Sequence, residues 1–450
     1  MRRALLAVLA ALCAAPTWAQ PPPIGSLHPA ERFSAAQLES WASRYGTPLY
    51  VYDGDRILRN YHAVAAAFQT LYPRSRVLYA LKANSNQAIV ALLKRAGAGA
   101  EVVSGGEIAL ARKLGYAGSE IFFTSSSKSR AELELALAEG VMINIDSLDE
   151  LEQVARLSAG RPARTKISFR INPDVDPHTH AKVATGILES KFGLHLAEGI
   201  ALRAVRRALE LEALELTGLH CHIGSQITSP APFRLEAQEL LIFVQQIEAE
   251  FGARLRFLNF GGGLGIPYRD GETVIDPRQW AEVLVAELAA AQLTDPPELW
   301  VEPGRALVGD AGLLLTRVNS VKPAPATTFI NVDAGFNTLA RPAMYDAYHR
   351  VRAVGKSGPG RLVDIAGVIC ETGDILARDR SLPNLEQGDL LMLLDTGAYG
   401  FAMASEYNSR PLPPEILIRG DRVELIREAG TAGDLLRRQI LPPDLQSPPP

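Results

Sequence analysis

Eight short apolar segments, separated by helix-like stretches, constrain the fold of this chain more than any other feature. They are Val77–Leu81, Ala100–Val103, Ile121–Thr124, Val141–Ile145, Lys166–Ile171, Leu216–His222, Phe257–Phe260 and Leu299–Val301. Amphipathic or Ala/Leu-rich stretches such as Ala131–Glu139 and Arg234–Glu250 lie between them. Eight strands, each followed by a helix, predict an α/β fold, a TIM-like (β/α)8 barrel.

Polar or glycine residues follow many of these predicted strands. They are Lys82-Ala83-Asn84, Ser104-Gly105-Gly106, His222-Ile223-Gly224-Ser225, Gly261-Gly262-Gly263 and Glu302-Pro303-Gly304-Arg305. The carboxyl ends of barrel strands form one mouth, where catalytic groups collect. We therefore expect residues that are far apart in the sequence to meet in one site.

A second domain is predicted after the barrel, because the helical period disappears beyond Arg305. Short strand-like segments separated by Gly/Pro turns follow, at Phe329–Asp333, Leu362–Val368, Leu390–Asp395 and Glu415–Ile418. They predict a C-terminal all-β domain. The expected divisions are an N-terminal segment (20–53) whose strand-like end joins the β domain, the barrel (54–309), the β domain (310–432) and a tail (433–450). The tail's proline-rich end is predicted to be disordered.

The N-terminus has the pattern of an export signal, residues 1–19. Arg2 and Arg3 precede the apolar run Ala4–Ala15, and Thr17-Trp18-Ala19 resembles a cleavage site. This predicts a periplasmic or secreted protein. If the segment is only an N-terminal extension, a cytoplasmic location is expected instead. No segment is predicted to span a membrane.

Charge and cysteine content exclude two classes of protein. Basic residues number 46 and acidic residues 50, a net charge of −4, and no basic stripe interleaved with aromatics occurs, so a nucleic-acid partner is not expected. Of the three cysteines, Cys221 and Cys370 lie within motifs of the predicted site. Two thiols make no disulfide framework.

Each chemical motif has a functional and a structural interpretation. Lys82 at a barrel mouth fits an amine nucleophile with a lowered pKa, or a lysine that caps a strand. Gly261-Gly262-Gly263 fits a phosphate site after strand seven, or a tight turn. Glu302 and Arg305 fit a functional pair or a local ion pair.

Two histidines raise the question of a metal site. His220 and His222 share one face of a strand, but a zinc site needs a third ligand and no obvious partner is present. We therefore predict no metal and a ring that stacks on a planar cofactor.

Ten motifs in order carry a resemblance to a known family. They are Tyr79-Ala80-Leu81-Lys82-Ala83-Asn84, Val103-Ser104-Gly105-Gly106-Glu107, Arg170-Ile171-Asn172-Pro173, Thr185-Gly186 with Lys191-Phe192-Gly193, His222-Ile223-Gly224-Ser225-Gln226, Gly261-Gly262-Gly263, Glu302-Pro303-Gly304-Arg305, Arg341-Pro342-Ala343-Met344-Tyr345, Cys370-Glu371-Thr372-Gly373-Asp374 and Gly397-Ala398-Tyr399. The chain resembles the ornithine/diaminopimelate/arginine decarboxylases, the fold-type III pyridoxal-phosphate enzymes. The resemblance implies the barrel-plus-β architecture shared with alanine racemase and ornithine decarboxylase. It also implies a homodimer whose active sites are shared, with the Cys370-Glu371 loop supplied by the partner.

The resemblance also implies roles for the cofactor residues. Lys82 would form a Schiff base with pyridoxal 5'-phosphate, and His222 would stack on its ring. Ser225, Gly261, Gly262, Gly263 and Arg305 would hold the phosphate, Glu302 would face the pyridine nitrogen, and Tyr399 would close over the cofactor. Alanine racemases place an arginine at the position of Glu302, so the glutamate favours decarboxylation. Cys370 is the candidate proton donor, and Lys82 is its competitor.

Within the family the pattern is most similar to the diaminopimelate decarboxylases. Arg305, Arg341, Tyr345 and Tyr399 would bind the substrate, with its distal carboxylate at the arginines, and Glu371 would meet its distal ammonium. The implied reaction converts meso-2,6-diaminopimelate to L-lysine and CO2. Departures from the family pattern occur at Glu101, Ser125-Ser126, Val368 and Thr372. They leave open a decarboxylase of another basic amino acid (D- or L-lysine, ornithine or arginine), and a non-catalytic cofactor-binding homologue is the third alternative.

Overall fold

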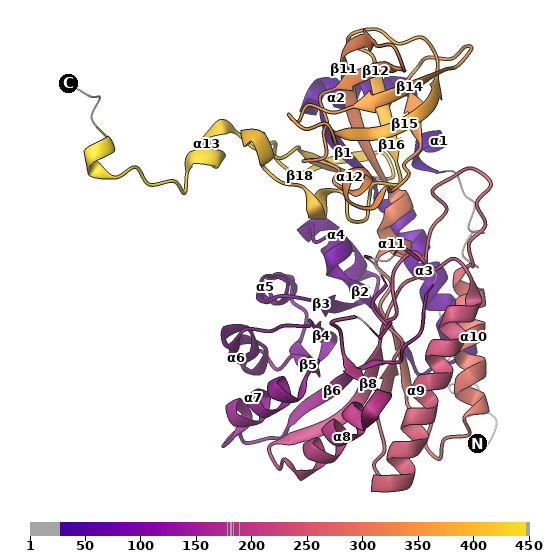
Figure 1. The fold of residues 1–450 in the computed structure, drawn as a ribbon, viewed down its shortest axis with the longest axis vertical. Coiled ribbons are helices and arrows are strands. Elements are labelled where there is room, and N and C mark those ends of the chain that lie inside the picture. Colours follow the sequence, from indigo (N-terminus) through magenta and orange to yellow (C-terminus); the bar gives the residue numbers. More distant parts are fainter. Residues whose placement is uncertain (1–27, 178, 181, 183, 189, 447–450) are drawn as a thin grey trace, which may run out of the picture.

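The computed structural model describes residues 28–446 except 178, 181, 183 and 189. The export signal predicted at residues 1–19 lies outside this part of the chain. Figure 1 shows two bodies one above the other, an α/β barrel and a domain built on a mixed sheet. No helix in the described part of the chain combines the length and the apolar character needed to cross a membrane.

The barrel is closed and parallel, which confirms the predicted fold class. Its eight strands are β2 (Ser75–Ala80), β3 (Gly99–Val102), β4 (Ile121–Thr124), β5 (Met142–Ile145), β6 (Thr165–Asn172), β8 (Leu214–Cys221), β9 (Phe257–Asn259) and β10 (Glu298–Val301). They pair in the order β5-β4-β3-β2-β10-β9-β8-β6, and a pairing of β5 with β6 closes the ring. The two-residue strand β7 (Leu194–His195) extends β6 on one side.

Helices cover the outside of the barrel. They are α3 (Gly54–Leu71), α4 (Gln87–Arg95), α5 (Gly105–Lys113), α6 (Arg130–Ala138), α7 (Leu148–Ser158), α8 (Ile200–Glu210), α9 (Pro230–Phe251) and α10 (Pro277–Ala290). Every residue of β4 is buried, as expected for a parallel strand with side chains inside the barrel and helices outside. Ser104 and Ser129 cap α5 and α6 by accepting hydrogen bonds from backbone N–H groups of the first turn.

One end of the barrel is filled by apolar side chains. Leu78, Phe122, Phe257 and Trp300 form a separate buried cluster, with Met142 packed against it. The rings of Phe257 and Trp300 stack with centroids 3.8 Å apart. Phe257 and Met142 are the first residues of β9 and β5, and Phe122 is the second residue of β4, so the cluster lies toward the end of the barrel opposite the carboxyl ends of the strands.

The second domain is a nine-stranded mixed sheet. Its strands are β1 (Leu49–Asp53), β11 (Gly312–Pro323), β12 (Thr328–Val332), β13 (Val351–Ala353), β14 (Arg361–Ala366), β15 (Ile375–Leu382), β16 (Leu390–Leu394), β17 (Glu415–Arg419) and β18 (Arg422–Arg427). The order is β15-β14-β12-β11-β1-β17-β18, with β16 between β11 and β13. Strand β1 pairs antiparallel with β11 and parallel with β17, so the segment before the barrel lies inside this sheet. The domain also carries the short helices α1 (Pro29–Arg32), α2 (Ala35–Tyr45), α11 (Arg305–Val308) at its junction with the barrel, and α12 (Arg341–Tyr345).

Buried polar contacts join the two bodies beside the barrel mouth. Arg56 in α3 forms an ion pair with Asp310 at 2.5 Å. The side chain of Asn84, which follows β2, donates a hydrogen bond to the carbonyl oxygen of Gly397 at 3.1 Å. These contacts hold the strand ends of the barrel next to the mixed-sheet domain.

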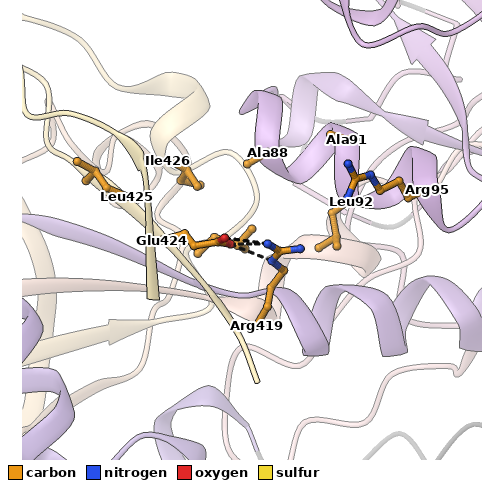
Figure 2. A pocket seen from close by; sticks show the side chains of 9 residues that line it. Ala88, Ala91, Leu92, Arg95, Arg419, Glu424, Leu425 and Ile426 are labelled. Carbon is orange, nitrogen blue, oxygen red and sulfur yellow. Dashed lines mark hydrogen bonds and ion pairs between the residues drawn. The ribbon is translucent and has the colours of Figure 1, made fainter. Parts of the chain in front are cut away.

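A surface pocket of about 330 Å³ lies farther along this junction, between α4 and the β17–β18 hairpin. Figure 2 shows Arg419 and Glu424, both of this hairpin, joined on one wall of the pocket; their closest atoms are 2.7 Å apart. Because none of the predicted site residues lines it, this pocket is a feature of the domain contact. Beyond β18 the chain forms α13 (Ala432–Leu436), which extends away from both bodies in Figure 1.

Candidate active site

Lys82 lies at the carboxyl end of β2, in the three-residue 3-10 helix η1 (Leu81–Ala83). Its Nζ is 2.7 and 2.8 Å from the two carboxylate oxygens of Glu101 in the neighbouring strand β3. The side chain of Lys82 is 32% exposed, whereas Glu101 is fully buried. The amine therefore faces the open mouth and is anchored from below by a carboxylate.

The ion pair changes the expected protonation state of this lysine. Desolvation acts to lower the pKa of Lys82, but the negative charge of Glu101, supported by Tyr399 and Glu302, outweighs it and raises the pKa to about 12. Desolvation also raises the pKa of Glu101, to about 7, against the opposing effect of Lys82. This direction differs from the lowered pKa that one interpretation of the sequence allows for Lys82, because that interpretation includes the burial and not the carboxylate of Glu101.

Glu302 follows β10 and is 4% exposed. Its Oε1 accepts a hydrogen bond from Asn259 Nδ2 at 2.6 Å, and its Oε2 lies 3.2 Å from Nε2 of His220. Desolvation raises the pKa of Glu302, while the positive charge of Lys82 opposes the shift. The structure thus places a buried carboxylate, oriented by two neighbours, within the electrostatic reach of the lysine.

The Gly261-Gly262-Gly263 loop lies close against the backbone of neighbouring strand ends. A Cβ on Gly262 would lie 2.2 Å from the carbonyl oxygen of Glu302, and one on Gly263, at φ +106°, would lie 2.7 Å from that of Gly224. The glycines are therefore required by close backbone approach. The N–H of Gly261 donates to Asn259 Oδ1 at 2.9 Å, whereas that of Gly263 donates no hydrogen bond within the described chain.

His222 lies beside this loop, and its Nδ1 accepts a hydrogen bond from the N–H of Gly262 at 3.3 Å. Desolvation and the nearby charges of Lys82 and Arg170 hold the pKa of His222 well below its ordinary value. The ring is therefore neutral and its orientation is fixed. Among the residues that the structure describes, no group of three or more His, Cys, Asp or Glu side chains is placed to hold a metal ion.

Arg305 connects the loop after β8 with the mixed-sheet domain. Its Nη2 donates to Ser225 Oγ at 3.0 Å, and its guanidinium lies 5.0 Å from the ring centroid of Tyr399. Tyr399 has a left-handed backbone (φ +57°), and its N–H donates to the carbonyl oxygen of Ala83 at 2.8 Å. The contact with Ala83 holds Tyr399 next to the turn that carries Lys82.

Arg305 and Arg341 share one hydroxyl group. Tyr268 Oη accepts hydrogen bonds from Arg305 Nη1 at 2.5 Å and from Arg341 Nη1 at 3.1 Å. Both arginines are buried, with 6% and 7% exposure. Neither forms an ion pair with a carboxylate within the described residues, so the structure places two buried cations side by side without a counter-ion.

His349 supports Arg341 from behind. Its Nδ1–H donates to the carbonyl oxygen of Leu394 at 2.8 Å, which leaves Nε2 to accept from Arg341 Nη1 at 3.0 Å. Burial, followed by the charge of Arg341, lowers the pKa of His349 to about 3. The imidazole is therefore a neutral acceptor that fixes the guanidinium without neutralising it.

Two of the predicted residues, Cys370 and Glu371, are not joined to this cluster in the described chain, and a third, Tyr345, lies in a helix that reaches it. Cys370 is exposed, and its N–H donates to Asn408 Oδ1 at 2.9 Å. Glu371 is also exposed and accepts a hydrogen bond from Tyr407 Oη at 2.6 Å. Tyr345 ends α12, the helix that begins with Arg341. No hydrogen bond or ion pair in the described chain joins Cys370 or Glu371 to Lys82 or Glu302.

Several residues of the site were not predicted. Glu101 was noted only as a departure from a family pattern, and Asn259 and Tyr268 were not singled out. Asn259 is the last residue of β9, so its position at a strand end was an available signal. Tyr268 lies in a loop outside any named strand or helix, and no local pattern places it between two arginines.

Comparisons with known proteins agree with one another. The family model described as "Pyridoxal-dependent decarboxylase, pyridoxal binding domain" matches residues 55–309. A diaminopimelate decarboxylase of Archaeoglobus fulgidus is 44% identical over 401 residues, which cover 88% of this chain and 94% of the relative. The crystal structure of diaminopimelate decarboxylase from M. jannaschii has a TM-score of 0.86 at 39% identity, covering 91% of this chain and 95% of that one. That from Helicobacter pylori, complexed with L-lysine, has a TM-score of 0.83 at 35% identity, covering 89% and 98%.

Proposed function

Because this chain belongs to the pyridoxal-dependent decarboxylases, and among them to the diaminopimelate decarboxylases, we propose that it converts meso-2,6-diaminopimelate to L-lysine and CO2. The observation that carries this substrate is the pair of buried arginines, Arg305 and Arg341, which have no carboxylate partner among the described residues. Lysine and ornithine have only an ammonium at the end distant from the reacting carbon. Leaving two guanidinium groups unpaired in a closed site would be costly. A distal carboxylate beside Arg341, together with the cofactor's phosphate beside Arg305, would satisfy both.

The chain's residues fit pyridoxal 5'-phosphate. Lys82 supplies the amine that holds the cofactor covalently, and the neutral ring of His222 supplies a stacking surface. The free N–H of Gly263, with Ser225, Arg305 and the rest of the glycine loop, supplies donors and charge for the phosphate. Tyr399 closes the mouth beside Ala83.

When bound, the cofactor supplies an electron sink for the pair left on the substrate when CO2 departs. Glu302 keeps a proton on the ring nitrogen, which strengthens that sink. The hydrogen bond from Asn259 and the contact with His220 hold the carboxylate in one orientation for this task. Glu101 holds the proton of the free Lys82 amine until the cofactor is bound.

A homodimer with shared active sites completes the site in this proposal. Cys370 and Glu371 carry functions that need contact with the substrate, yet both are exposed in the single chain. The loop is held in shape by Asn408 and Tyr407, as expected of a loop that is presented to a partner. From the partner, Cys370 donates the proton to the carbon that lost CO2, and Glu371 meets the distal ammonium, while Tyr345 and Arg341 bind the distal carboxylate.

Export is a separate part of the proposal and rests on the sequence of residues 1–19 alone. A periplasmic or secreted enzyme would appear in the exported fraction without these residues. Cell fractionation with N-terminal sequencing tests this, and a full-length chain in the cytoplasm would contradict it.

The decisive experiment is a CO2-release panel with meso-diaminopimelate, D- and L-lysine, D- and L-ornithine, and L-arginine. We expect kcat/KM to be highest for meso-diaminopimelate by about a hundredfold or more, since the others lack the distal carboxylate. A higher kcat/KM for any of the other amino acids would contradict the assignment of diaminopimelate as the substrate. It would leave the assignment of a decarboxylase reaction unchanged. No release from any of them, with the cofactor bound, would indicate a non-catalytic homologue.

A further inference from the structure

A second cavity, of about 450 Å³, lies at the opposite end of the barrel from Lys82. We call it the basal cavity. Its lining comes from the first residues of several strands, including Arg76 of β2, Met142 of β5, Lys166 of β6 and Glu298 of β10. Lys82 and Glu302 follow the last residues of β2 and β10, so the two sites are separated by the length of the barrel. Its volume is within the range of small-molecule sites.

The basal cavity is strongly basic. Five arginine or lysine side chains line it, against a single carboxylate; the cations are Arg76, Arg161, Arg164, Lys166 and Arg256, and the carboxylate is Glu298. Glu298 pairs with Arg76 at 3.0 Å, and Arg256 pairs with Glu215 at 2.6 Å.

Three cations remain without an acidic partner in the described chain. Within the part of the chain that the structure describes, Arg161 donates only to the carbonyl oxygen of Leu137, at 2.7 Å, and Arg164 and Lys166 form no ion pair. Glu215 is paired in register with Lys166 on the neighbouring strand, but its carboxylate binds Arg256. Three unpaired cations on the rim of one cavity create a positive potential that attracts anions.

The floor of the cavity is apolar. It consists of Leu137, Val141 and Met142 together with the stacked rings of Phe257 and Trp300. The two rings belong to the buried apolar cluster that fills this end of the barrel. The indole Nε1 of Trp300 already donates to Glu298 at 2.9 Å. Met142 is half-buried and the other four side chains are buried, so the floor offers a small area of apolar contact, while charge recognition comes from the rim.

We propose that the basal cavity is a binding site for a small organic phosphate, with the phosphate groups at Arg161, Arg164 and Lys166 and the organic portion over the apolar floor. Guanidinium and ammonium groups are the side chains that bind phosphate most strongly. The site is distinct from the cofactor's phosphate site, because its residues lie at the other end of the barrel. Its existence does not depend on which amino acid the enzyme decarboxylates.

Isothermal titration of the holoenzyme, with its cofactor fixed by borohydride reduction, tests this proposal. The two probes are ATP, which combines phosphates with an organic portion, and inorganic pyrophosphate, which has none. We expect saturable binding of one ATP per chain and weaker binding of pyrophosphate. The double variant Arg164→Glu, Lys166→Glu should weaken ATP binding about tenfold or more, because two attractive charges become repulsive.

A matched control is Lys322→Glu in β11, an exposed strand lysine of the other domain with no ion pair in the described chain. It should leave ATP affinity unchanged, and all three chains should retain decarboxylase activity, since no catalytic residue is altered. Absence of saturable binding by ATP, or an equal loss in Lys322→Glu, would overturn the proposal. If pyrophosphate bound as tightly as ATP, the proposed contact between the organic portion of the ligand and the apolar floor would be wrong.

Discussion

Single side chains decide the substrate in this site, and Arg341 is the most informative of them. It is buried, faces Arg305 across Tyr268 and has no carboxylate partner in the described chain. Arg341→Ala should lower kcat/KM for diaminopimelate by about a hundredfold, the cost of losing a charge-assisted hydrogen-bonded pair. Cofactor affinity, measured by absorbance titration of the apoenzyme, should change little. Unchanged kinetics would contradict the assignment of the distal carboxylate to this residue.

Tyr268 tests whether the two arginines act as a positioned pair. Its hydroxyl accepts from both guanidinium groups, so Tyr268→Phe should loosen them and raise KM for diaminopimelate about tenfold, with a smaller effect on kcat. The matched control is Tyr348→Phe, whose ring stacks between Arg269 and Arg380. Steady-state kinetics measures both variants. An equal change in the two would indicate a loss of stability and not of positioning.

Glu101 sets the pH at which Lys82 becomes reactive. The pKa of Lys82 is about 12, so at neutral pH the amine is protonated and its neutral fraction rises tenfold with each pH unit. Glu101→Gln removes the stabilising charge, so the opposing desolvation should lower the pKa of Lys82. The rate of cofactor binding to the apoenzyme should then reach its plateau at lower pH. Glu101→Asp keeps the charge and should keep the wild-type pH profile, and identical profiles for the amide and the acid would contradict this role.

At the scale of loops and strands, the glycine loop makes a matched comparison possible. Gly263 and Gly271 both have positive φ values, +106° and +76°, but only Gly263 would place a Cβ against backbone, 2.7 Å from the Gly224 carbonyl oxygen. Gly263→Ala should therefore cost about 1–3 kcal/mol more than Gly271→Ala in free energy of unfolding. It should also weaken cofactor binding, because the loop must shift. Chemical denaturation and cofactor titration measure the two effects, and equal losses would show that backbone conformation alone matters.

The eight barrel strands could be predicted because parallel strands buried on both faces leave continuous apolar runs in the sequence. The predicted segment at Ile121–Thr124 coincides with β4, and the others differ from their strands by a few residues at the ends. The mixed sheet was harder to predict from the sequence. Strand β11 and its pairing with β1, which lies far away in the chain, depend on long-range contacts that no local pattern encodes.

The same distinction holds for the site. Residues directly after a strand could be placed at the barrel mouth, and Lys82 and Glu302 are examples. The sequence could not predict the ion pair of Lys82 with Glu101 or the hydroxyl of Tyr268 that two arginines share. Each depends on which side chain of a neighbouring element points inward. The raised pKa of Lys82 could not be predicted for that reason.

For the whole molecule, shared active sites make a quantitative prediction. If Lys82 of one chain works with Cys370 of the other, Lys82→Ala and Cys370→Ala dimers should both lack activity. Mixing and refolding them in equal amounts should restore about one quarter of wild-type activity, because half of the dimers are mixed and each contains one intact site. Activity assays on the purified mixture measure this. No recovery in a mixed dimer, or full activity of Cys370→Ala alone, would contradict the arrangement.

The Lys82–Glu101 pair has a consequence for newly made chains that have not yet met their cofactor. An ammonium group does not attack carbonyl carbons, so we expect free sugars and metabolic aldehydes to react slowly with Lys82 while Glu101 favours its protonated form. An aldehyde that the surrounding donors hold at the mouth has more time to meet the neutral amine, so this carboxylate should favour the bound cofactor over glycation.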